Sequence, residues 1–169
     1  MANPLSMYVP IKQDAQSQAI AAQLAQQFVP NVQVTLDQSQ IVHYAKIVLI
    51  PNPSGEGTLA LLLSTEFDGS MNSYLKFFWD NTSTQQAFAG LAALALVPPD
   101  PPVTDLTGFE AFVNATNLSQ PADLYQAYTK SVRQINAKPA TTTTDATTDV
   151  APDVTAPQLG TTSETAGTA

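Results

Sequence analysis

The chain has 169 residues, with six basic and fourteen acidic side chains, a formal net charge of -8 and no cysteine. Few cations make a poor match for a phosphate backbone or an anionic membrane surface, so neither nucleic acid nor membrane is an expected partner, and disulfides, thiolate nucleophiles and cysteine-based metal sites are excluded. Residues 138–169 are dominated by Thr, Ala, Asp and Pro, which predicts a disordered acidic tail after one folded domain, residues 1–137.

The first elements expected are a short strand and a helix. Residues 5–11 form the candidate strand, and Pro10 favours an edge position or the end of that strand. Asp14 is expected to cap the helix that follows, which Pro30 is expected to end. The buried face of this helix is predicted from three apolar residues spaced four apart: Ile20, Leu24 and Phe28.

Residues 41–79 are the most informative stretch, because two long apolar strands are joined there by a loop rich in Pro and Gly. The strands, residues 41–50 and 59–66, are largely apolar on both faces, whereas a sheet with one solvated face alternates apolar and polar side chains. One face is expected to meet helices, and a second copy of the chain is expected to cover the other. The only histidine, His43, lies in the first strand, on the face that holds Ala45.

Several helices and one late strand are expected after this hairpin. Ser70 is a suitable N-cap for a helix at residues 71–79. An alanine-rich helix is expected at 85–96, and the proline-rich connector at 98–102 stops it. The remaining expected elements are a helix at 105–117, a strand at 123–128 and a helix at 129–136.

The order of these elements predicts the fold class. It is that of an α+β protein with a ferredoxin-like βαββαβ antiparallel sheet and extra helices. The sequence shows no signal peptide, and no apolar run approaches the ~20 residues that span a bilayer. We therefore expect a soluble, cytoplasmic protein.

Five segments carry a resemblance to a known group of proteins. They are Pro-Ile-Lys at 10–12, Ile-Val-His-Tyr-Ala-Lys at 41–46, Thr-Glu-Phe-Asp-Gly-Ser at 65–70, Met-Asn-Ser-Tyr-Leu at 71–75 and the run 125–135. Together they resemble small uncharacterised bacterial proteins of the dimeric α+β barrel superfamily, in which two ferredoxin-like sheets pack face to face. The resemblance therefore implies a homodimer that closes into such a barrel.

Dye-decolorising peroxidases share this superfamily and carry a Gly-x-x-Asp-Gly motif. The corresponding residues here are 65–69, where Thr65 stands in place of the first glycine. The distant similarity implies, as one alternative, a haem-dependent peroxidase-like oxidoreductase with His43 as the iron ligand and Asp68 as the distal acid or base. Lys46 stands where the related strand has arginine, so the charge is kept but the guanidinium fork is lost.

The candidate ligand-binding residues are His43, Lys46, Glu66, Asp68 and Tyr74. His43 and Asp68 are also the catalytic candidates, with a structural strand histidine and an Asp that bonds its own backbone as the alternatives. Lys46 and Glu66 are either a cross-strand pair or a polar spot in an apolar cavity. Tyr74 either lines a pocket for a flat ligand or belongs to the core.

Three functions remain open from the sequence. The first is a protein that binds a small apolar ligand in a cavity between the sheet and the helices. The second is the haem-dependent enzyme, and the third is a non-catalytic interaction protein whose dimer and tail recruit partners. A single histidine and no cluster of acidic ligands predict no metal site.

Overall fold

The computed structural model describes residues 2–137; the predicted disordered tail, residues 138–169, lies outside the described residues. Three strands form one antiparallel sheet in the order β1-β3-β2. They are β1 (Ala2–Pro10), β2 (Val42–Pro51) and β3 (Thr58–Asp68). The α+β class is confirmed for this part of the chain.

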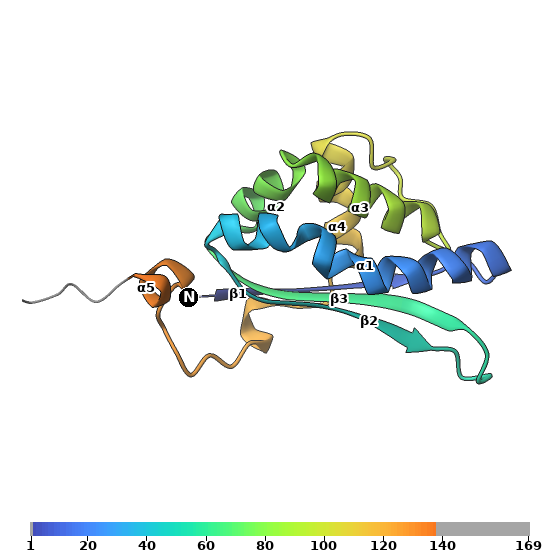
Figure 1. The fold of residues 1–169 in the computed structure, drawn as a ribbon, viewed down its shortest axis with the longest axis horizontal. Coiled ribbons are helices and arrows are strands. Elements are labelled where there is room, and N and C mark those ends of the chain that lie inside the picture. Colours follow the sequence, from blue (N-terminus) through green and yellow to red (C-terminus); the bar gives the residue numbers. More distant parts are fainter. Residues whose placement is uncertain (1, 138–169) are drawn as a thin grey trace, which may run out of the picture. The chain divides into compact units, whose positions relative to one another are not determined.

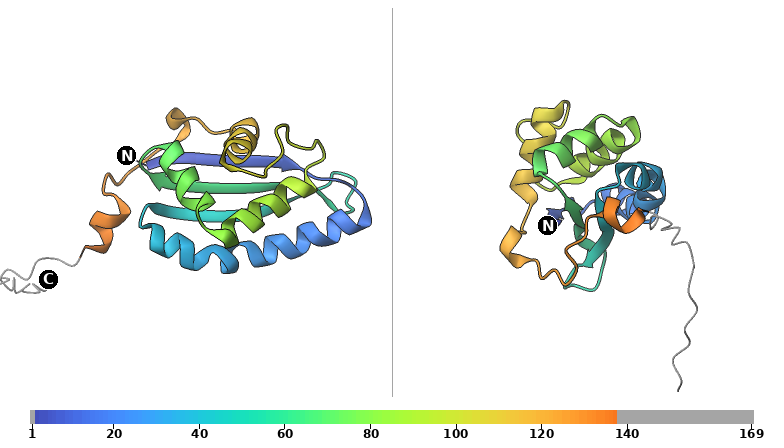
Figure 2. Two further views of the ribbon diagram at one scale, coloured as in Figure 1. Left: turned by 90° about the horizontal axis from the view of Figure 1, so that it is seen from above. Right: turned by 90° about the vertical axis from the view of Figure 1, so that its left-hand side faces the viewer.

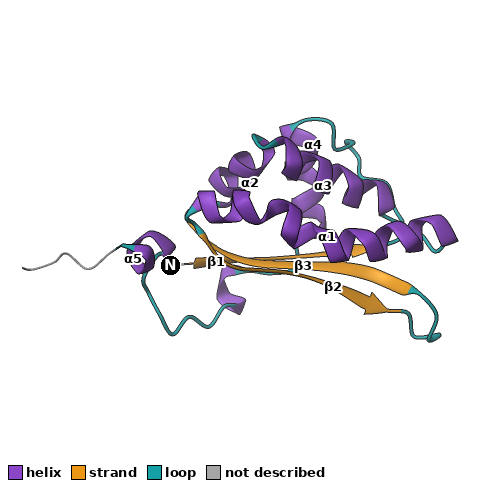
Figure 3. Ribbon diagram, in the orientation of Figure 1, coloured by secondary structure: helices purple, strands orange, loops and turns teal. Residues whose placement is uncertain are grey.

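Five α-helices and one 3₁₀ turn accompany the sheet within residues 2–137. They are α1 (Ala15–Ser39), α2 (Met71–Trp79), α3 (Thr82–Leu94), α4 (Leu106–Thr116), η1 (Pro121–Asp123) and α5 (Val132–Asn136). Helices α1 to α4 lie on one face of the sheet, which we call the inner face (Figure 1). The chain after α4 passes to the opposite, outer face (Figure 3).

The inner face forms the core because its apolar side chains recur at every second strand residue. Leu63 of β3 lies opposite Met7 of β1 and Ile47 of β2, and the flanking Leu61 and Phe67 are also buried. Helix α1 runs along β2 and α4 lies against β1, with α3 close to α1 (Figure 2). The strand residues that alternate with these core residues point to the outer face, which the helices α1 to α4 do not cover.

The helix caps expected from the sequence are confirmed. Asp14 accepts the backbone N–H of Ser17 at 2.9 Å, and this hydrogen bond is the main reason that the pKa of the exposed Asp14 carboxyl is lowered. Ser70 accepts the backbone N–H of Ser73 at 3.3 Å and begins α2 at the expected residue. Both caps satisfy N–H groups that a first helical turn leaves free.

The expected end of the first helix at Pro30 is wrong, because α1 continues to Ser39. A proline inside a helix costs one backbone hydrogen bond. Beyond Pro30 the helix still buries Val32 and Thr35, and this burial offsets the lost hydrogen bond. Its end comes at Gln40, which adopts a left-handed conformation with a φ of 53°. Ile20, expected in the buried stripe, is largely exposed.

The prediction of a strand at 123–128 is wrong. The described residues therefore hold three strands, and the βαββαβ sheet is not complete among them. The sequence of this segment alternates like that of a strand, but the free edge of β1, where a fourth strand would pair, already bonds to other parts of the chain. Isolated bridges join Ile11 to Ala95 and Met7 to Asn117 along that edge. The segment instead lies at the outer face. The helix expected at 129–136 begins only at Val132, as α5.

Candidate functional site

A β-bulge at the start of β2 sets the position of the only histidine. Val42 lies opposite Phe67 and Tyr44 lies opposite Glu66, so His43 is an extra residue on β2 with no partner of its own on β3. Strict alternation predicts that His43 lies on the same face as Ala45, and this prediction is wrong, because His43 lines a pocket with Tyr44 and Glu66 of the outer face. A bulge re-aims the side chain of the inserted residue, and here it turns the imidazole toward the end of β3.

His43 and Asp68 form a hydrogen-bonded pair in which Nε2 lies 3.0 Å from Oδ1. Both side chains are mostly buried, with 12% and 15% of their surface exposed. Because an ionised carboxylate only accepts hydrogen bonds, Nε2 must carry the proton and donate it. In the neutral imidazole this leaves Nδ1 as a hydrogen-bond acceptor.

The second oxygen of the Asp68 carboxylate binds the C-terminal segment. Val132 donates its backbone N–H to Oδ2 at 2.8 Å. Burial is the largest influence on the pKa of Asp68 and raises it, but the hydrogen bonds from Val132 and His43 together lower it below its ordinary value. The ionised carboxylate is therefore the stable form, and it holds two parts of the chain at once.

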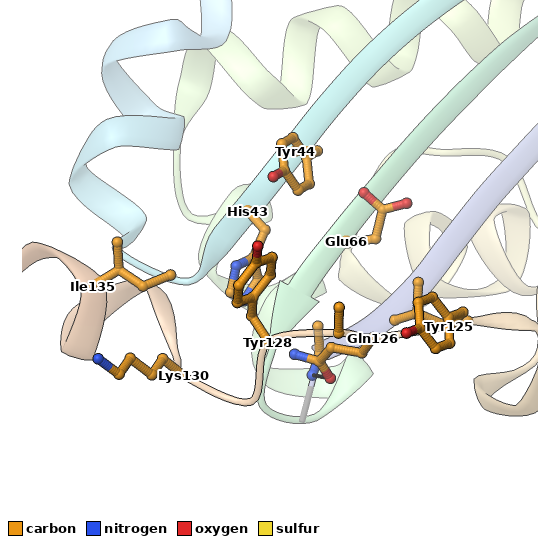
Figure 4. A pocket seen from close by; sticks show the side chains of 11 residues that line it. His43, Tyr44, Glu66, Tyr125, Gln126, Tyr128, Lys130 and Ile135 are labelled. Atoms are coloured by element: carbon orange, nitrogen blue, oxygen red, sulfur yellow. Dashed lines mark hydrogen bonds between the residues drawn. The ribbon is translucent and has the colours of Figure 1, made fainter. Parts of the chain in front are cut away.

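Residues 124–135 lie at one end of the outer face and form one side of an open pocket next to His43. The backbone N–H of Ala2 donates to Oε1 of Gln126 at 3.1 Å, which ties this segment to the start of β1. The pocket has a volume of about 380 Å³ (Figure 4). Its lining consists of Ala2, His43, Tyr44, Glu66, Leu124, Tyr125, Gln126, Ala127, Tyr128, Lys130 and Ile135.

The structure brings together three of the five candidate site residues. His43 and Glu66 line the pocket, and Asp68 holds His43 from behind. Lys46 lies outside it, in a neighbouring surface hollow that it shares with Glu66 and Tyr44. Within residues 2–137 no ion pair joins Lys46 to Glu66. These residues lie on the outer face, not in the expected cavity between sheet and helices.

Tyr74 belongs to the core and not to the pocket. Its ring stacks on Phe67 with a centroid separation of 4.0 Å, and its hydroxyl lies 3.0 Å from the hydroxyl of Thr65. Burial raises the pKa of Tyr74 to about 12, against the opposing effect of the Thr65 hydrogen bond. Its role is to pack α2 onto the sheet.

The sequence reasoning missed most of the aromatic and cationic lining: Tyr44, Tyr125, Tyr128 and Lys130. From the sequence alone, Tyr125 and Tyr128 could line a pocket or belong to the core, and only the tertiary structure places them at the pocket. Their one visible signal was two large aromatic side chains in an otherwise polar stretch. Such residues are expensive to expose, so they point to a surface that binds something.

The site does not fit the haem arrangement that the resemblance implies. An iron ligand and a distal acid or base stand on opposite faces of a haem, but His43 and Asp68 are in direct contact. Ligation through Nε2 would also break that hydrogen bond.

Among residues 2–137 no group of three or more His, Asp or Glu side chains is placed to hold a metal ion. No described helix combines the length and apolarity that crossing a membrane requires.

Comparison with known proteins finds no match among family models, curated proteins or solved structures. The pocket and its surroundings are therefore the basis for a function.

Proposed function

We propose that the protein binds a small, largely apolar molecule in the pocket on the outer face of the sheet. The observation that carries this proposal is the combination of apolar walls with one fixed polar pair. The walls include Leu124 and Ile135, and the pair is His43 with Asp68. A volume of about 380 Å³ lies within the usual range for small-molecule sites, ~300–1,000 Å³.

The polar pair gives the pocket a means of orienting a ligand. Asp68 fixes the ring of His43 through Nε2, so Nδ1 is left to accept a hydrogen bond from a hydroxyl or amine. Preorganised groups of this kind cost little conformational entropy when a ligand binds. The apolar walls then supply affinity, since burying apolar surface contributes about 25 cal/mol per Å².

A neutral fluorescent probe tests this proposal. N-phenyl-1-naphthylamine should bind the purified protein and gain fluorescence as it leaves water. Ala127 lines the pocket, and a tryptophan there (Ala127→Trp) should fill it and abolish the gain. Ala122 lies in η1 outside the lining, so Ala122→Trp is the matched control and should bind the probe normally. Equal binding by the two variants would place the binding site elsewhere.

Native mass spectrometry of the protein from its own source gives a second test. A retained molecule should appear as a mass above that of the chain and disappear in Ala127→Trp. The same spectrum reports the oligomeric state.

We also propose a homodimer of the α+β barrel type. The arrangement β1-α1-β2-β3 corresponds to the first four elements of a βαββαβ unit. On the outer face, Val48 of the edge strand β2 is exposed and lies outside the pocket lining, which supports a second copy of the chain as the cover of that part of the face. Light scattering at micromolar concentration should give twice the chain mass; a monomer would refute the dimer and leave the pocket proposal intact.

A further inference from the structure

We infer that the ligand of this pocket is an organic cation, an alkylammonium group bound by the carboxylate of Glu66 and the rings of Tyr44, Tyr125 and Tyr128. This inference rests on the proposed function, because it names the ligand class of the same pocket. Three observations carry it: a carboxylate without an ion pair among residues 2–137, exposed aromatic faces around it, and positive groups that do not pair with it.

The carboxylate of Glu66 is available to a ligand. It lies on the outer face of β3, directly opposite Tyr44 of β2, and is partly buried. Across the described residues, 2–137, the structure gives its side chain neither an ion pair nor a hydrogen bond. A carboxylate that is partly withdrawn from water gains most from a positive partner, since Coulomb attraction strengthens as the local dielectric falls.

Three tyrosines expose their rings at the same pocket. Tyr44, Tyr125 and Tyr128 are 74%, 89% and 82% exposed, so their faces are not used by the core. Figure 4 shows Tyr44 and Tyr128 to one side of Glu66 and Tyr125 to the other. The face of an aromatic ring attracts cations, and pockets of several such rings recognise quaternary ammonium groups. The tyrosines and Glu66 therefore favour the same kind of ligand.

None of the three positive groups near the pocket forms an ion pair with Glu66 within residues 2–137. Lys46 shares a neighbouring surface hollow with Glu66 but does not pair with it. Lys130 belongs to the C-terminal segment and is exposed, and Figure 4 shows its side chain extending away from Glu66. His43 is paired with Asp68. An anionic ligand would be repelled by the Glu66 carboxylate, whereas a cation is attracted by that carboxylate and by the aromatic rings. Charge complementarity therefore selects the cation.

Two probes of equal shape and different charge test this inference. Choline and 3,3-dimethylbutan-1-ol differ only by the exchange of a quaternary nitrogen for carbon. In a ligand-observed NMR titration of the full chain, choline should bind at least tenfold more tightly, on the order expected for a cation–π site with a carboxylate. Its methyl signal should move upfield, because it lies over tyrosine rings.

Two pairs of variants locate the effect. Glu66→Gln should weaken choline at least about tenfold and leave the neutral alcohol unchanged, whereas Glu56→Gln, in the exposed hairpin loop, removes the same charge and should bind like wild type. Tyr128→Leu should reduce the upfield shift. Tyr8→Leu, on β1 outside the pocket lining, should not.

The outcomes separate this inference from the proposed function. Equal binding of the two probes, or choline binding unchanged by Glu66→Gln, overturns the cation inference. If N-phenyl-1-naphthylamine still binds in a manner sensitive to Ala127→Trp, but choline neither binds nor displaces it, the pocket proposal stands and only the inference fails. If neither N-phenyl-1-naphthylamine nor choline binds the wild-type protein, both the proposed function and the cation inference are refuted.

Discussion

Val132 donates its backbone N–H to the carboxylate of Asp68 across 64 residues of sequence, at 2.8 Å. The other oxygen of that carboxylate binds His43, so a single side chain joins the end of β3, the bulge of β2 and the C-terminal segment. The pocket lies between these parts. Asp68 therefore links the parts of the chain that form the pocket without lining it.

Asp68→Asn should loosen the C-terminal segment. An amide has one oxygen where the carboxylate has two, so it cannot accept from both Val132 and His43 in the same geometry. We expect faster hydrogen exchange at the Val132 amide and a loss of about 1–3 kcal/mol in the free energy of unfolding. Asp37→Asn, an exposed change in α1, is the control. Wild-type exchange at Val132 in Asp68→Asn would contradict the role of this carboxylate.

The contribution of Asp68 to stability should depend on pH. Its pKa is lowered in the folded protein, so the contribution is complete above the unfolded value of about 3.9 and is lost as the pH falls through the folded pKa. Denaturant unfolding at pH 7, 4 and 2.5 should show the advantage of wild type over Asp68→Asn shrinking only at the acidic end. An advantage of constant size would indicate a role that does not involve charge.

Tyr74→Phe should reduce stability without affecting ligand binding. The change removes the partner of the buried Thr65 hydroxyl, and an unsatisfied buried polar group costs about 1–3 kcal/mol. Tyr8→Phe is the matched control, since Tyr8 lies at the partly exposed outer face. Thermal unfolding measures the first effect and N-phenyl-1-naphthylamine binding the second. Weaker probe binding with unchanged stability would return Tyr74 to the ligand site.

Two glycines in helices should respond in opposite ways to alanine. A Cβ at Gly108, in the first turn of α4, would overlap with the backbone carbonyl of Pro102, whereas one at Gly90 in α3 meets no atom within 4 Å. Gly108→Ala should therefore lower the melting temperature by forcing the connector away from α4, at a cost of about 1–3 kcal/mol. Gly90→Ala should raise it, by about 0.5–1 kcal/mol in unfolding free energy. Similar shifts for both would contradict the close packing at Gly108.

The bulge at His43 shows why the site was only partly predictable. Alternation along β2 predicts that His43 and Ala45 share a face, but the bulge turns His43 to the outer face, whereas Ile47, two residues beyond Ala45, packs against the core. The inserted residue has no local signature in the sequence, because the strand remains extended through it. Its effect is visible only once β2 is paired with β3 and the register is known.

The sequence by itself determined what depends on neighbours a few residues apart. The caps at Asp14 and Ser70, the helix α2 and the two apolar strands of the hairpin all follow from contacts within one turn or one strand. The tertiary structure alone decided the course of residues 124–128 and the pairing of Asp68 with Val132. These depend on which strand edge is already occupied and on a hydrogen bond between residues 64 positions apart, and neither leaves a periodic pattern in the chain.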